Sequence, residues 1–139
     1  MRLANSQDAE AAFYAAFERA DADAMMAVWA QDDAVFCVHP GGSRVSGVAA
    51  VRAAWRSIFS QGAALRFELM DLQTFTLPTV AVHTLCERIS VRGQGGPPHL
   101  VMATNIYMLT ASGWRILGHH ASPLPRIPIG TEPRPPNLH

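Results

Sequence analysis

The sequence predicts an α+β fold in which three N-terminal helices pack on a strongly curved, mixed but mainly antiparallel β-sheet, forming a cone with an internal pocket. Apolar side chains recur at helical spacing in the first third of the chain, and the period becomes extended after Gln61-Gly62. The links between the extended segments are short, which implies antiparallel neighbours. We expect one domain over residues 1–122, because 139 residues suffice for a single hydrophobic core, and a proline-rich tail over residues 123–139.

Three helices are predicted before residue 60. The first buries one stripe, made of Ala9, Ala12, Phe13, Ala16, Phe17 and Ala20. Its N-cap is Asn5 or Ser6, and Asp21 caps a second, shorter helix. Ser46 is the expected N-cap of the third helix, whose inner face consists of Val48, Val51, Trp55, Ile58 and Phe59.

Five strands are predicted, over residues 33–39, 64–77, 79–91, 99–110 and 114–121. The segment 99–110 carries apolar side chains on both faces, so both faces of the sheet should be covered. Three helices can cover only one face. The other face needs a different cover, so we expect a homodimer formed through the outer surface of the sheet.

The composition excludes several classes of partner. Basic and acidic residues number 11 each, so we expect no nucleic-acid binding and no membrane binding. The sequence lacks a signal peptide and a spanning apolar run, which predicts a cytoplasmic protein with reduced thiols at Cys37 and Cys86. All eleven basic residues are Arg, which suggests a GC-rich bacterium. Cys37-x-His39 is the only spacing that could contribute to a metal site, so we expect neither a metal nor a cofactor.

Several motifs resemble the SnoaL-like branch of the nuclear-transport-factor-2-like (NTF2-like) superfamily over residues 5–122. They are the Ala20-Asp21 break, Val28-Trp29, Asp32-Asp33 before a strand that ends in His39-Pro40, Ser46-Gly47 before the helix with Trp55, and the segment WRILGHHAS. The resemblance implies a dimer formed through the open sheet face and a pocket in the cone. Members of the superfamily include isomerases, cyclases, dehydratases and binding modules, so the fold does not give the reaction.

The chain departs from the ketosteroid isomerases of this superfamily, which keep an Asp-Pro general base and a Tyr with a protonated Asp as oxyanion donors. His39-Pro40 stands at the Asp-Pro position, and Phe13 stands at the spacing of the Tyr. Tyr14 is displaced by about 100° around the helix, and residues 102–105 include no carboxylate. Steroid isomerisation is therefore disfavoured.

We expect His39 at the rim of the pocket, as a general base or as a protonated clamp for a carboxylate. The expected walls are Phe13, Phe17, Trp29, Trp55, Phe59 and Tyr107, with polar groups from Asn105 and from His119 or His120. The two tandem histidines should point to opposite faces of their strand, so at most one enters the pocket. Alternatively, the ring of His39 forms hydrogen bonds only to the backbone, and Trp29 and Trp55 are packing residues of the hydrophobic core.

Two other groups of polar residues have simple explanations. Glu68, Asp71 and Glu87 have arginine neighbours, so cross-strand ion pairs are the simpler account of them. The turn at residues 41–44 could hold an anion or be a plain tight turn. Two functions remain: a dimeric protein that binds a small, partly apolar or carboxylated molecule, which we prefer, or a cofactor-independent isomerase, cyclase or dehydratase-like enzyme with His39 as its base.

Overall fold

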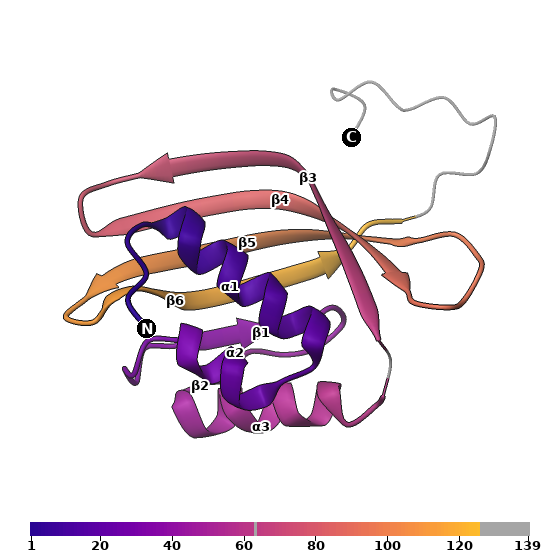
Figure 1. Cartoon of the computed structure of the whole chain (residues 1–139), viewed down its shortest axis with the longest axis horizontal. Helices are drawn as coiled ribbons and strands as arrows, with labels where there is room; N and C mark the ends of the chain where they lie inside the picture. The colour runs from indigo at the N-terminus through magenta and orange to yellow at the C-terminus, as the bar shows by residue number, and fades with distance from the viewer. Residues whose placement is uncertain (63, 126–139) are drawn as a thin grey trace.

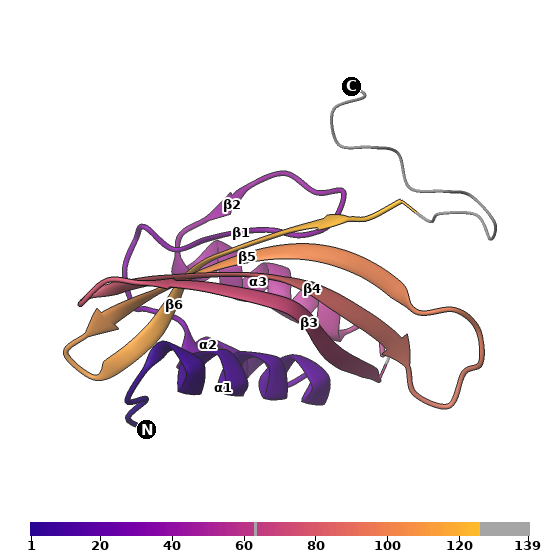
Figure 2. The same cartoon turned by 90° about the horizontal axis from the view of Figure 1, so that it is seen from above.

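The computed structural model describes residues 1–62 and 64–125. Three helices and one mixed sheet make up the α+β fold that the sequence predicts. The elements are α1 (Ser6–Arg19), α2 (Ala22–Val28), β1 (Phe36–Val38), β2 (Val45–Ser46), α3 (Val48–Phe59), β3 (Leu65–Thr76), β4 (Val80–Val91), β5 (His99–Thr110) and β6 (Gly113–Pro123). Figure 1 shows α1 crossing in front of the sheet, with α2 and α3 below it beside β1 and β2, and Figure 2 shows that the sheet curves over α1. The described strands form one sheet in the order β2-β1-β6-β5-β4-β3.

Two of the predicted helix caps are confirmed, and the third is wrong. The side chain of Asn5 accepts from Asp8 N and that of Asp21 accepts from Ala24 N, so both cap their helices. Ser46 does not cap α3, because it lies in β2 and pairs with Phe36 of β1. Gly47 is the N-cap instead, and its φ of +89° makes the corner between the strand and the helix.

The four long strands form an antiparallel meander from β3 to β6, close to the predicted boundaries. The first strand is shorter than the predicted 33–39, because the side chain of Asp32 accepts from Ala34 N and makes a turn. The strand β1 runs parallel to β6, with Cys37 opposite His119, and this pair makes the sheet mixed. The end of β1 therefore lies beside the histidines of β6.

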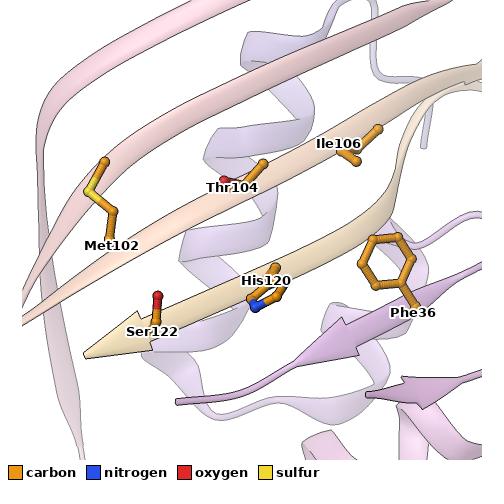
Figure 3. Close-up of a pocket in the computed structure, with 6 residues that line it drawn as sticks. All are labelled: Phe36, Met102, Thr104, Ile106, His120 and Ser122. Carbon is orange, nitrogen blue, oxygen red and sulfur yellow. The ribbon is translucent and has the colours of Figure 1, made fainter. Parts of the chain in front are cut away.

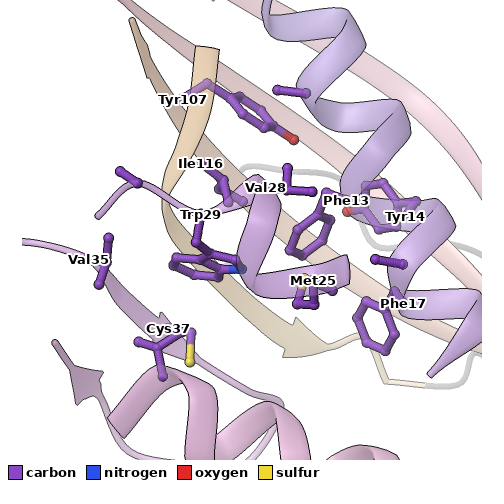
Figure 4. Packing of buried hydrophobic residues seen from close by; sticks show 14 of the residues in the cluster. Phe13, Tyr14, Phe17, Met25, Val28, Trp29, Val35, Cys37, Tyr107 and Ile116 are labelled. Carbon is purple, nitrogen blue, oxygen red and sulfur yellow. The ribbon is translucent and has the colours of Figure 1, made fainter. Parts of the chain in front are cut away.

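The core lies between the helices and the inner face of the sheet. Aromatic rings dominate it, and Phe13, Trp29, Trp55 and Tyr107 are at most 1% exposed. Figure 4 shows Phe13 of α1 directed toward Trp29 and Met25. The ring centroids of Phe17 and Trp55 are 4.8 Å apart, which is the distance of an edge-to-face pair.

In the described part of the chain, no helix covers the outer face of the sheet. This face exposes Phe75 and Met102, and it holds a shallow pocket of about 330 Å³ lined by Phe36, Met102, Thr104, Ile106, His120 and Ser122 (Figure 3). A second, wider hollow of about 1210 Å³ borders it near Met70 and Leu100. The strand β6 extends to Pro123, which pairs with Val101. The remaining tail, from residue 126 on, lies outside the described residues. Within the described part, no helix is long and apolar enough to cross a membrane.

Candidate functional site

A line of four buried polar side chains crosses the inner face of the sheet. The hydroxyl of Tyr14 lies 2.5 Å from Oε2 of Glu87, and Nδ2 of Asn105 lies 3.0 Å from the same hydroxyl. Oδ1 of Asn105 lies 2.6 Å from Nδ1 of His119. We call these four residues, Glu87, Tyr14, Asn105 and His119, the polar row. It joins α1, β4, β5 and β6 by hydrogen bonds.

When Glu87 is ionised, all three hydrogen bonds of the polar row donate in the same direction, toward Glu87. A carboxylate only accepts, so the Tyr14 hydroxyl donates to Glu87 and itself accepts from the Asn105 amide. The amide oxygen then accepts from His119, which places the imidazole proton on Nδ1. In this state Nε2 of His119 carries a lone pair.

Burial shifts the protonation of the polar row toward its neutral forms. It raises the pKa of Glu87 to about 7, against the hydrogen bond from Tyr14, which lowers it. Burial, together with the charge of Glu87, raises the pKa of Tyr14 far above its usual range. Burial, followed by repulsion from His39 and His120, lowers the pKa of His119 to about 3. At pH 7 Tyr14 and His119 are therefore neutral.

His39 lies at the end of the polar row, half-buried after β1. Its ring meets the ring of Trp55 edge-on with centroids 4.7 Å apart, and it lies 5.9 Å from the ring of His119. Its Nε2 lies 3.3 Å from the sulfur of Cys37. Burial lowers the pKa of His39 to about 4 and raises that of Cys37 to about 11, so the two are a neutral pair and not a thiolate and an imidazolium.

Most of the predicted site residues come together. The rings of Phe13, Phe17, Trp29, Trp55 and Phe59 form one aromatic cluster with those of His39 and His119. Asn105 lies in the polar row beside it. Tyr107 lies farther along β5 and packs on His83 at 4.8 Å.

The tandem histidines lie on opposite faces, as predicted. His119 is 1% exposed on the inner face, and His120 is exposed on the outer face, where it lines the shallow pocket. Only His119 therefore belongs to the candidate site.

Three donors in this interior have no partner within the described residues: the indole nitrogens of Trp29 and Trp55 and the hydroxyl of Tyr107. Their residues are at most 1% exposed. Buried donors without a partner are rare in native proteins, and each one calls for a water molecule, a ligand or another explanation. The rings of Trp29 and Trp55 are 6.5 Å apart, so two of the three donors belong to one neighbourhood.

Sequence reasoning missed Tyr14 and Glu87. The ion pair predicted for Glu68 exists, 3.1 Å from Arg88, but Glu87 is 2% exposed and bonds to Tyr14, so its assignment to an ion pair was wrong. Arg115 bonds two backbone carbonyls instead. Strand alternation was the available signal, because it places Glu87 on the same face as Ala81 and Leu85.

A second buried polar group lies between α1 and β4. The ring of His83 bonds Glu10 through Nδ1 and Ser6 through Nε2, the latter at 2.9 Å. Ser6 is 2% exposed, so its hydroxyl is closed to a substrate. Over residues 1–62 and 64–125, no three His, Cys, Asp or Glu side chains are grouped so that they could hold a metal ion.

Comparison with solved structures identifies the fold. A protein from Thiobacillus denitrificans, provisionally assigned as a calcium/calmodulin-dependent protein kinase type II association domain, is 39% identical with a TM-score of 0.84 and covers 90% of this chain and 99% of its own. A provisionally assigned dehydratase of the NTF2-like family from Streptomyces avermitilis is 31% identical with a TM-score of 0.77, and the match covers 85% of this chain and 92% of that protein. A cystatin-like fold protein from Nostoc punctiforme is similar in fold alone, at 13% identity and a TM-score of 0.75 over 92% and 98%.

Sequence comparison agrees. The F-box protein SKIP8 of Arabidopsis thaliana is 28% identical over 99 residues, which are 71% of this chain and 41% of that protein, so the chain spans less than half of that relative. The family model of the SnoaL-like domain matches residues 7–126. The chain belongs to the SnoaL-like domain family, with the NTF2-like, cystatin-like cone fold.

Proposed function

We propose that this chain binds a small, partly apolar or carboxylated molecule in the cone, at the end marked by His39, and that it does so as a cytoplasmic homodimer. The observation that carries the proposal is the pair of indole donors of Trp29 and Trp55 inside the aromatic cluster, for which residues 1–62 and 64–125 offer no acceptor. A ligand with an aromatic or apolar body can pack against these rings, and a polar atom on it can accept from an indole N–H.

The charge of the site favours a neutral ligand at pH 7. Burial lowers the pKa of both His39 and His119, so neither ring is an imidazolium at that pH. A carboxylate could still be held by His39, but the ring must first take up a proton. Affinity for a carboxylate should therefore rise as the pH falls, whereas affinity for a neutral phenol should change little.

The homodimer is supported by the outer face of the sheet, where Phe75 is 62% exposed and Met102 is 36% exposed. The Thiobacillus denitrificans protein carries the name of an association domain, which accords with assembly through this fold. We expect light scattering to give a dimer at micromolar concentration.

Two matched substitutions test whether the dimer forms through the outer face of the sheet. Met102→Glu should give a monomer, because it places a charge in the buried surface of the dimer. Leu109→Glu should leave the dimer intact, because Leu109 is similarly exposed, at 40%, but alternation from Tyr107 puts it on the helix side. A wild-type monomer would contradict the dimer.

A cofactor-independent enzyme with His39 as general base is the second candidate. One group in the polar row favours it, because the second N–H of the Asn105 amide is not used within the row and is a donor of the kind that stabilises a developing oxyanion. The lowered pKa of His39 counts against it, since a general base works best with a pKa near the operating pH. We therefore keep binding as the primary function.

The substitution His39→Gln separates the two candidates, with His120→Gln on the outer face as its matched control. Benzoate and phenol serve as probes in calorimetric titrations at pH 5.5 and pH 8. In the wild type, benzoate should bind more tightly at pH 5.5. His39→Gln should remove this pH dependence, and His120→Gln should keep it.

The other outcomes are equally informative. Loss of a catalysed reaction with unchanged affinity in His39→Gln would favour the enzyme. Unchanged affinity and activity with a lower melting temperature would mean that His39 only ties β1 to its turn, and the proposed site would be wrong.

A further inference from the structure

Three hydrogen bonds of the polar row join Glu87 to His119 through Tyr14 and Asn105. We propose that Glu87 determines which hydrogen-bonding group a ligand must offer to His119, because protonation of Glu87 reverses every hydrogen bond of the row. The ligand in this inference rests on the proposed function. The reversal itself belongs to the free protein and can be measured without a ligand.

With Glu87 ionised, donation runs from His119 toward Glu87. The Nδ1–H of His119 donates to Oδ1 of Asn105, Nδ2 of Asn105 donates to Tyr14, and Tyr14 donates to the carboxylate. A neutral imidazole has only one N–H, so Nε2 is then an acceptor. A ligand at this nitrogen must bring a donor, such as a hydroxyl or an amide N–H.

With Glu87 protonated, donation runs the other way. The carboxylic O–H donates to the oxygen of Tyr14, whose own proton turns toward Asn105. The Asn105 amide turns over, so its oxygen accepts from Tyr14 and its nitrogen donates to Nδ1 of His119. The imidazole proton must then lie on Nε2, which becomes a donor toward a carbonyl or carboxylate.

The protons balance in this exchange. Glu87 takes up one proton from solvent, and the hydroxyl proton of Tyr14 changes its acceptor without leaving its oxygen. His119 gives up the proton on Nδ1 and receives one on Nε2, so it is neutral before and after. No bond between heavy atoms forms or breaks.

The surroundings of Glu87 leave the row free to act as a unit. Opposite Glu87 on β3 lies the apolar Leu69, and on β5 lies Val101. The titratable side chains that face the interior from the elements packed around it are Glu10, Tyr14 and Glu18 of α1, His83 of β4, Tyr107 of β5 and His119 of β6. Two of the carboxylates are already engaged, because Glu10 bonds His83 and Glu18 accepts from Phe67 N.

The protonation equilibria permit both states near neutral pH. Burial raises the pKa of Glu87 to about 7, whereas Tyr14 and His119 stay neutral on both sides of that value. Between about pH 6 and 8, therefore, the population of the two states of the row changes with the pH.

The test is an NMR titration of the free protein, labelled with ¹⁵N in histidine and ¹³C in the Glu carboxyl, from pH 5.5 to 8.5. At high pH Nδ1 of His119 should have the shift of a protonated ring nitrogen and Nε2 that of an unprotonated one. As the pH falls, the shifts of the two ring nitrogens should exchange. The midpoint of this exchange should equal the midpoint of the Glu87 carboxyl titration. His120, exposed on the other face, is the internal control.

The variant Tyr14→Phe should cut the row, so the Glu87 carboxyl still titrates while the tautomer of His119 no longer follows it. If this variant fails to fold, the wild-type titration decides alone. A constant His119 tautomer across the midpoint of Glu87 would overturn the inference, and so would conversion of His119 to imidazolium in that range.

Two uncharged probes connect the row to binding. Phenol offers a donor, and acetophenone offers only an acceptor. The ratio of their affinities should shift toward acetophenone by about fivefold between pH 8 and pH 6, the factor expected for one net hydrogen bond. If the tautomer reverses but neither probe binds, the proposed function is wrong and the reversal of the row is still supported.

Discussion

Tyr14 and Glu87 lie 73 residues apart in the sequence, and the hydroxyl of Tyr14 donates to Oε2 of Glu87 across 2.5 Å in the interior of the protein. Tyr14 comes from α1 and Glu87 from β4, so this hydrogen bond ties the first helix to the centre of the meander. Because Glu87 is 2% exposed, its carboxyl depends on Tyr14 for a partner that water does not supply.

The energetic coupling of this pair is the first prediction. Tyr14→Phe and Glu87→Gln should each lower the free energy of unfolding by about 1–3 kcal/mol, because each leaves a buried polar group with a poorer partner. The double variant should lose less than the sum of the two, by at least about 0.5 kcal/mol. Urea unfolding measures all three. Glu68→Gln, which breaks the exposed pair with Arg88, is the control and should change stability by less than about 1 kcal/mol. Strict additivity would show that the contact is energetically silent.

The pH dependence of stability is the second prediction. Folding raises the pKa of Glu87 from 4.5 to about 7. The contribution of this residue to the free energy of unfolding is therefore fully present below pH 4.5 and is lost as the pH rises through 7. This loss amounts to about 3 kcal/mol. His119 acts in the opposite sense, because its pKa falls from 6.5 to about 3 and its contribution is lost as the pH falls below 6.5.

Comparing the wild type with Glu87→Gln isolates the first of these effects. The difference in unfolding free energy between the two proteins should change between pH 5 and pH 8, with the wild type losing relative stability toward pH 8. The measurement is urea unfolding at several pH values. A difference that does not vary with pH would mean that Glu87 titrates in the folded protein as it does in the unfolded chain.

The group of Ser6, Glu10 and His83 yields the third prediction. His83→Leu should destabilise by about 3–5 kcal/mol, because Glu10 would keep a buried carboxylate without its partner. Ser6→Ala removes only one hydrogen bond and should cost about 1 kcal/mol. The double variant His83→Leu with Glu10→Leu should recover part of the loss in thermal unfolding. A double variant less stable than His83→Leu alone would contradict this explanation.

Gly118 gives the fourth prediction. A Cβ at this position would lie 2.3 Å from Cε1 of Phe36, the residue paired with it on β1. Gly118→Ala should therefore cost about 1–3 kcal/mol, and Phe36→Val in the same chain should restore part of that stability. Gly95→Ala, which meets nothing within 4 Å, is the matched control for thermal unfolding. Equal melting temperatures for the two alanine variants would show that the ring of Phe36 moves aside freely.

The layout of the fold was predictable because it depends on the spacing of apolar residues and on the cap and turn residues between the elements. The stripe of α1, the choice of Asn5 or Ser6 as its cap, the cap Asp21 and the four strands of the meander follow from local spacing. Ser46 was misassigned because a serine before a helix suits a cap as well as a strand. Its pairing with Phe36 is a tertiary fact that local sequence does not carry.

The candidate site was only half predictable, for a similar reason. His39, Asn105 and the aromatic rings were found because strand ends and helical faces locate them. Tyr14 was set aside because the first helix was compared with the isomerase pattern, and Glu87 because arginines flank it in sequence. Their meeting depends on how α1 crosses β4 and β5, which no local pattern specifies.

The most direct test of binding in the cone is a pair of crystal structures, one of the protein as purified and one after soaking in phenol. The proposal predicts electron density for one ring against Trp55, with its hydroxyl within hydrogen-bonding distance of an indole nitrogen or of His39. An unchanged aromatic cluster at saturating phenol, with Trp29 and Trp55 donating only to ordered water, would contradict it.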